Sequence, residues 1–303
     1  MTGVTLLSAP TNLGLRPPVP TATPGCAKAP EVLRAAGLYQ RLGAADAGLV
    51  RCPRYVDDAR RGRIRNQDAI LDYSIRLAGR LTALLDEGRR PLVLGGDCSL
   101  LLGIGLALRR RGRYGLLHID GHTDFRHPGN SDMVASLAGE DLAAAVGLHY
   151  PAVSLLGGEQ HFRPDDVVQV GCRDDDEAMD EAGALLAVVV PASHVVRQGV
   201  PAVIDPIVTT VARPELDGYW IHVDLDVLDE SVMQAVDSPS PGGLSPDQLI
   251  ELLQALAPNA SGAHVGIYDP DLDPEGTAAQ VVVDCIVEGL AGLGTNHSRD
   301  RAS

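Results

Sequence analysis

Two short stretches of the sequence carry residues whose types and spacing suit a metal ion. HIDGHTDF places Asp120, His122 and Asp124 at every second position, and HVDLDVLDE places Asp224 and Asp226 in the same way. Alternate side chains of an extended segment point to one side, so each set can converge. Carboxylates a few ångströms apart repel each other unless a cation lies between them. The stretches therefore predict one divalent ion, or two bridged by shared carboxylates.

The competing interpretation is that these acids are turn residues or helix caps at the tips of loops. It explains a single Asp-x-Asp well, but it explains the two stretches together poorly. A third stretch, PLVLGGDCSLLLG, raises the question of what Cys98 does. Its thiol could fill space, attack a substrate or bind a metal. A nucleophile needs a neighbouring base, and the sequence shows no evident Cys-His arrangement.

The elements that must position these stretches alternate along the chain. Apolar, often β-branched runs are separated by segments of helical periodicity, and such alternation predicts a parallel sheet covered on both faces. In such a sheet ligands gather at the carboxyl ends of the strands. We expect one three-layer α/β domain over residues 1–303, with a flexible tail at 296–303. The predicted strands are 4–8, 48–52, 91–94, 114–119, 167–170, 186–190, 219–223 and 263–268, and the predicted helices are 30–42, 66–87, 99–111, 246–256 and 278–293.

The composition argues against several classes of protein. A net charge of −15 and an isoelectric point near 4.9 argue against nucleic-acid and anionic-membrane partners. No apolar run approaches the roughly 20 residues of a membrane span. The N-terminus lacks the basic-then-apolar pattern of a signal peptide, so a cytoplasmic location is expected. Five cysteines without a C-x-x-C pair predict reduced thiols.

On these motifs the chain resembles the ureohydrolase family, which includes arginase, agmatinase and formimidoylglutamase. The resemblance covers APEVLRAAGL, LGGDCS, HIDGHTDF, VGCRDDDE, HVDLDVLDE, SPSPGGLSPDQL and GIYDPDLDP, and so most of the chain. It implies an α/β/α domain with an eight-stranded parallel sheet. It also implies a two-manganese cluster whose bridging hydroxide attacks an amidine or guanidine carbon. A small-molecule guanidino substrate and a homo-oligomer, either a trimer or a hexamer, complete this expectation.

The resemblance assigns the metal ligands residue by residue. Most members have a histidine after Gly-Gly-Asp where this chain has Cys98, and a hydroxyarginine-hydrolysing branch also has cysteine there. We therefore expect Cys98 to be a thiolate ligand. Thiolate is softer than imidazole, so zinc or iron is an alternative to manganese on the Cys98 side. The expected ligands are Cys98, Asp120, His122, Asp124, Asp224 and Asp226.

Two further acids are carried over from the family. Asp124 is expected to orient the hydroxide as well as to bind metal. The family's glutamate that faces the guanidinium lies two residues before an Asn-Pro or Ser-Pro, and we place it on Asp271, whose alternative role is that of a turn acid. Asp176 matches the acid that holds a substrate α-amino group, but the second such acid, three positions later, is Met179 here.

The proton-handling His-Gly pair of most arginases and agmatinases is absent from the stretch after Phe125. Glu140 is the candidate proton carrier in its place, unless the leaving group needs no help. Asn130, in the same stretch, is a candidate substrate-binding residue. These departures favour an arginine-derived guanidine that is N-hydroxylated, because it depends less on a proton donor. The alternatives are formimino or amide hydrolysis by the same hydroxide, and a non-catalytic protein that keeps the fold.

Overall fold

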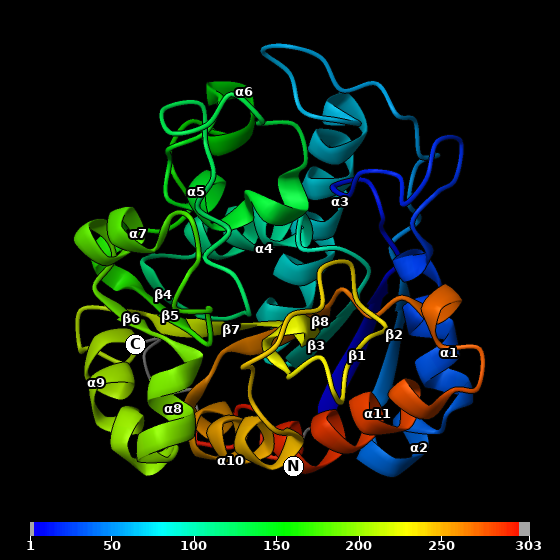
Figure 1. The fold of residues 1–303 in the computed structure, drawn as a ribbon. Coiled ribbons are helices and arrows are strands. Elements are labelled where there is room, and N and C mark those ends of the chain that lie inside the picture. Colours follow the sequence, from blue (N-terminus) through cyan, green and yellow to red (C-terminus); the bar gives the residue numbers. More distant parts are fainter. Residues whose placement is uncertain (1–2, 297–303) are drawn as a thin grey trace.

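The computed structural model describes residues 3–296, which form three layers around one eight-stranded sheet (Figure 1). All strand pairs are parallel, and the strand order is β2-β1-β3-β8-β7-β4-β5-β6. The predicted eight-stranded parallel sheet is confirmed. The strands are β1 (Val4–Ala9), β2 (Ala45–Leu49), β3 (Arg90–Gly95), β4 (Tyr114–Ile119), β5 (Val167–Val170), β6 (Val188–Val190), β7 (Gly218–Asp224) and β8 (Gly262–Gly266).

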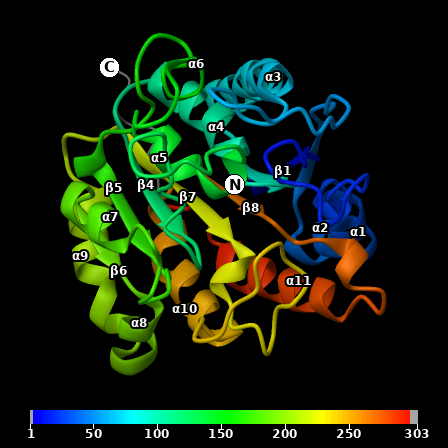
Figure 2. The same cartoon turned by 45° about the horizontal axis from the view of Figure 1, so that its top comes forward.

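Helices cover both faces of the sheet, as Figures 1 and 2 show from two directions. One apolar cluster joins the sheet to the helices of the first face, and a second cluster joins it to the helices of the other face. The first face carries α3 (Gln67–Asp86), α4 (Leu100–Arg109), α5 (Asp141–Ala145), α6 (Pro151–Ser154) and α7 (Met179–Leu185). The other carries α1 (Ala29–Ala35), α2 (Leu38–Leu42), α8 (Ala192–Gln198), α9 (Pro201–Val211), α10 (Pro246–Leu256) and α11 (Thr277–Leu290).

The two clusters explain why the central strands are mainly apolar. In β3, Leu92 and Leu94 join one cluster whereas Val93, between them, joins the other. Successive side chains of a strand point to opposite faces, and both faces of this sheet are covered, so neither can be polar along its length. Polar side chains that do occur within these strands are therefore exceptions with a local cause.

Several predicted elements differ from the observed ones. The second strand is 45–49 rather than 48–52. Its register with β1 pairs Thr5 with Ala45. The predicted helix 30–42 is two helices, since Gly37 adopts φ = 90° between them. The predicted tail lies outside the described residues except for Asn296, whose N–H donates to the carbonyl of Pro258. No helix within residues 3–296 is long and apolar enough to cross a membrane.

Candidate metal centre

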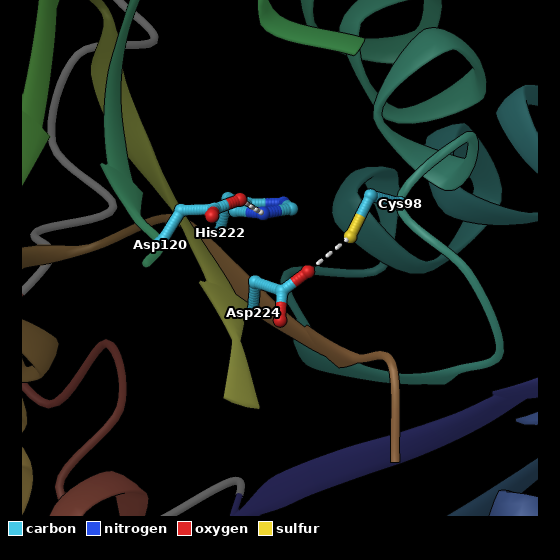
Figure 3. A group of neighbouring side chains, drawn as sticks. All are labelled: Cys98, Asp120, His222 and Asp224. Carbon is cyan, nitrogen blue, oxygen red and sulfur yellow. Dashed lines mark hydrogen bonds and ion pairs between the residues drawn. The ribbon is translucent and has the colours of Figure 1, made fainter. Parts of the chain in front are cut away.

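The carboxyl ends of β3, β4 and β7 bring the predicted metal-ligating residues together. Asp120 follows directly after β4, Asp224 is the last residue of the adjacent β7, and Cys98 follows β3. Cys98, Asp120 and Asp224, with His222, have potential ligand atoms that all lie within 4.8 Å of one another (Figure 3). Residues that are up to 126 positions apart in sequence thus meet at one point of the sheet edge.

The turn after β3 fixes the position of Cys98. A Cβ at Gly96 would lie 1.7 Å from the carbonyl oxygen of Thr11, so only glycine fits there. The buried carboxylate of Asp97 accepts hydrogen bonds from the Thr11 hydroxyl and from the N–H groups of Gly14 and Ser99. Cys98 is fully buried as a result, and its Sγ lies 3.0 Å from Oδ2 of Asp224.

The loop after β4 and the turn after β7 hold the other predicted ligands. The N–H of His122 donates to Oδ1 of Asp120 at 2.7 Å. Asp226 accepts from the N–H of Gly121, and its Oδ2 lies 2.8 Å from Nδ1 of His122. Asp124 has φ = 47°, a left-handed conformation that is uncommon outside glycine and is frequent at functional sites.

The carboxylates are too crowded to be ionised together without a cation. Burial raises the pKa of Asp120, Asp124 and Asp224 well above the ordinary range, and the charges of Asp124, Asp141 and Asp226 respectively raise it further. Oδ2 of Asp120 is buried and has no hydrogen-bond partner among the described residues. A divalent ion would supply both the missing charge and the missing partner. The residues therefore fit a divalent metal centre.

Cys98 and His122 fit the same interpretation. Burial, followed by the charge of Asp224, raises the pKa of the Cys98 thiol well above its ordinary value. A metal reverses this, because a coordinated thiol deprotonates. Burial lowers the pKa of His122, but the charge and hydrogen bond of Asp226 outweigh it and leave the pKa raised. Since an imidazole ligand must be neutral, metal binding at His122 would release a proton.

A cavity of about 390 Å³ borders the centre. The side chains that line it include His122, Asp124, Asp224 and Asp226. The rest of its lining is partly apolar and partly charged, with four further acids and the three arginines Arg16, Arg126 and Arg173, so it suits a small charged ligand with a short apolar part. The apolar lining residues are Leu15, Phe125, Ala138, Ala178 and Ile267, and the other acids are Asp175, Asp176, Glu177 and Asp237.

Asp176 lies in this cavity, where the sequence analysis placed a substrate-binding acid. Its carboxylate accepts hydrogen bonds from the N–H and hydroxyl of Thr123, at 3.0 and 2.5 Å, and from the N–H of Ala178. These contacts tie Asp176 to the loop that carries His122 and Asp124. Its position at the cavity is therefore fixed before any ligand arrives.

Asp271 does not lie in the cavity. It is half exposed and forms an ion pair with Lys28 at 2.6 Å. The stretch YDPDLDP contains two Asp-Pro pairs, and counting two residues back from the first gives Ile267, which does line the cavity. In this second register, the position matched to the family's glutamate carries an apolar side chain. Ile267 also has φ = 74°, a strained conformation that costs about 1–3 kcal/mol for such a residue.

Glu140 and Asn130 also lie outside the cavity lining. The fully buried carboxylate of Glu140 accepts from the N–H groups of Ala135 and Ser136, and its Oε2 lies 3.0 Å from Nε2 of His149. Asn130 donates to the Phe125 carbonyl and to Glu181. Both side chains hold loops in this structure.

Replacing Glu140 by alanine should therefore lower the stability of the fold and should not directly affect catalysis. We expect a loss of about 3–5 kcal/mol in the free energy of unfolding, because His149 and two N–H groups lose a buried charged partner. Urea denaturation of the metal-loaded variant measures this, and E140Q, which keeps an acceptor, should lose less. An E140A protein of unchanged stability that has lost its activity would return Glu140 to the role of proton carrier.

Three buried histidines and an aspartate beside the centre are not among the residues predicted from the sequence. Nε2 of His118 lies 3.4 Å from Asp141 and 3.7 Å from Asp120, and Nε2 of His222 lies 3.5 Å from Asp120. His264 of β8 lies next to His222. The stretches HID and HVD could have indicated two of these histidines, because a residue two positions before an aspartate in a strand lies on the same face of the sheet as the aspartate.

Comparisons with known proteins agree with this geometry. The sequence model of the arginase family matches residues 3–291. An arginase from Bacillus caldovelox is 30% identical over 227 residues, which are 73% of this chain and 75% of that protein. N(1)-aminopropylagmatine ureohydrolase from Thermus thermophilus is 34% identical over 221 residues, 69% and 65% of the two chains. The solved structure of the Bacillus caldovelox arginase has a TM-score of 0.84, with 26% identity and coverage of 96% and 98%.

Proposed function

Because the chain belongs to the arginase family, we propose that it is a metal-dependent hydrolase that cleaves a C–N bond of a guanidino or amidino compound. One observation carries the proposal. The six expected ligand positions converge at the carboxyl ends of three strands, and four of them line a cavity. The relatives named arginase and ureohydrolase support the same reaction class.

Two divalent ions are expected at this centre, and they would be held by Cys98, Asp120, His122, Asp124, Asp224 and Asp226. Manganese is the expected metal, with zinc or iron as alternatives on the Cys98 side. When bound, such ions lower the pKa of water so that hydroxide is available at neutral pH.

The side chains of the cavity would orient the reactants. Asp124 lines the cavity, where its carboxylate would accept a hydrogen bond from the attacking hydroxide. The acids of the lining, Asp176 among them, would attract a cationic substrate. Phe125 and Ile267 exclude water from the reacting carbon, which strengthens electrostatic contacts there. A planar C–N centre would thus be presented to hydroxide in a partly dry site.

The apolar Ile267 sets the preferred substrate. Arginine's guanidinium is always charged in water, and no carboxylate at this position compensates that charge. His122 is the one histidine among the described residues that line the cavity, and it is an expected ligand, so no free imidazole protonates a leaving amine. An N-hydroxyguanidine is less basic than a guanidine, and we propose such a compound, derived from arginine, as the substrate.

Kinetics on matched substrates test this proposal. We expect kcat/KM for N-hydroxyarginine to exceed that for arginine by on the order of 100-fold, since a missing general acid costs about 10²–10⁴. Released urea, hydroxyurea and amine are measured by mass spectrometry. I267E should raise kcat/KM for arginine and so reduce the difference in kcat/KM between the two substrates. Arginine turned over as efficiently as the N-hydroxy compound would sink the substrate assignment, and exclusive turnover of a formimino compound would move the enzyme to that class.

A further inference from the structure

A row of three histidines crosses the sheet one level below the candidate metal ligands. His118 of β4, His222 of β7 and His264 of β8 are register partners on adjacent strands, and all three are fully buried. Alternate residues of a strand share a face, so His118 and His222 lie directly beneath Asp120 and Asp224. The reaction proposed above uses none of these imidazoles, and buried polar groups need partners.

The hydrogen bonds of this row run in one direction. The indole Nε1–H of Trp220, which can only donate, donates to Nδ1 of His264 at 2.9 Å. His264 therefore carries its proton on Nε2 and donates it to Nδ1 of His222 at 2.6 Å. With its Nδ1 accepting, His222 in turn carries its proton on Nε2. Nε2 of His222 lies 3.5 Å from Oδ2 of Asp120. The two atoms form no hydrogen bond in the structure, but both are buried and neither has another hydrogen-bond partner among the described residues.

Close packing holds the rings in these positions. A Cβ at Gly262 would lie 2.3 Å from the ring of Trp220, so the glycine makes room for the indole to reach His264. On its other side, the ring of His222 stacks on that of His118, with 4.1 Å between centroids and 1° between the planes. The direction of the Nε2–H bond of His222 is thereby fixed by its neighbours.

The charge states agree with the hydrogen-bond geometry. Burial lowers the pKa of His264 to about 3. A neutral His264 can accept from Trp220, as a one-way chain requires, because a protonated ring has no lone pair with which to accept.

We propose that His222 is a positioning residue of the metal centre, which donates its Nε2–H to Oδ2 of Asp120 and so fixes how that carboxylate is presented. The hydrogen bond from Trp220 to His264, and that from His264 to His222, determine the tautomer of His222. The proposal rests on the proposed function in that Asp120 is taken as a ligand. It also excludes His222 as a ligand, although its Nε2 lies among the ligand atoms in Figure 3. A nitrogen that carries a proton has no lone pair for a metal.

Nitrogen NMR on protein labelled with ¹⁵N-histidine reads the tautomers directly. We expect neutral rings with the proton on Nε2 at both His222 and His264, in the metal-free and in the metal-loaded protein. Signals are assigned with H222Q and H264N. An unprotonated Nε2 of His222 in the loaded protein would show that it binds metal or that the chain runs the other way, and either result overturns the proposal.

The chain has a single tryptophan, which allows a second test. Replacing tryptophan throughout by 3-benzothienylalanine changes only Trp220, keeps its shape and removes its N–H. Loss of an outer partner weakens metal binding by about 10–100-fold, so we expect at least about tenfold weaker binding of one ion in a chelator competition. Tyr219→Phe removes another hydrogen bond of a buried aromatic on β7, to the Leu256 carbonyl, and should stay within about twofold of the parent.

The outcomes separate this proposal from the proposed function. Unchanged affinity for both ions in the benzothienylalanine protein would overturn the positioning role while leaving the hydrolase intact. If the unmodified protein binds no metal, the proposed function fails instead. The tautomers measured on the metal-free protein then decide whether the directed chain itself exists.

Discussion

The Asp226→Ala variant should be inactive and should lose metal. Asp226 accepts from the N–H of Gly121 and lies 2.8 Å from Nδ1 of His122, so its removal takes away one expected ligand and releases a second. We expect a fall in kcat/KM of about 10³-fold or more, because hydroxide at neutral pH depends on the bound ions. Asp120→Ala should have the same effect.

Elemental analysis and rate measurements on the same preparation check this prediction. The parent should hold two divalent ions per chain, and D226A fewer. A matched control is Asp174→Ala, because Asp174 bonds to Ser193 and does not line the cavity. D174A should keep both the metal and most of the rate. A fully active parent with no stoichiometric metal would refute the binuclear centre.

The second large effect concerns Cys98. If the thiolate is a ligand, Cys98→Ser should lose the ion on that side and about 10²-fold or more of the rate, since a hydroxyl is a poor ligand at neutral pH. Serine is close to cysteine in volume, so a purely space-filling thiol would tolerate the change. In a metal-loaded crystal structure, Sγ should lie about 2.3–2.6 Å from the ion, where the lower value is the zinc–thiolate distance.

Two further variants make the Cys98 test specific. Cys98→His should retain metal and some activity if the role is coordination, and it should fail if the thiol attacks the substrate. Cys26→Ser is the matched control, because Cys26 is equally buried and its Sγ contacts only the Thr11 carbonyl in the hydrogen bonds of the described chain. A C98S protein with unchanged metal content and rate would mean that the thiol only fills space.

Much of the fold follows from patterns that single segments carry. Runs such as 91–94 and 114–119 are apolar because both faces of their strands are covered, and they were predictable for that reason. Helices α7, α8 and α9 were not predicted. In α9, only Val203, Ile207 and Val211 are buried, and Pro206 lies inside the helix. The helical periodicity of its apolar residues is therefore hard to recognise in the sequence.

The candidate site was predictable where residues act through their immediate neighbours. Asp120, His122 and Asp124 lie on one loop, and their spacing alone indicates a shared target. Which residue of this stretch lines the cavity was not predictable, since YDPDLDP offers two registers and only the fold shows that Ile267, not Asp271, lies in the cavity lining. The directed histidine row depends on the register of three strands, which no local pattern contains.

The strand order has a consequence for how the chain can be made. β7 and β8 are among the last elements to leave the ribosome, yet they lie between β3 and β4 in the sheet. A nascent chain that has emerged as far as β6 must therefore keep the facing edges of β3 and β4 unpaired, and such edges recruit other chains. Substitutions that weaken residues 218–266 should lower the yield of protein from cells more than they lower the activity of the molecules that fold.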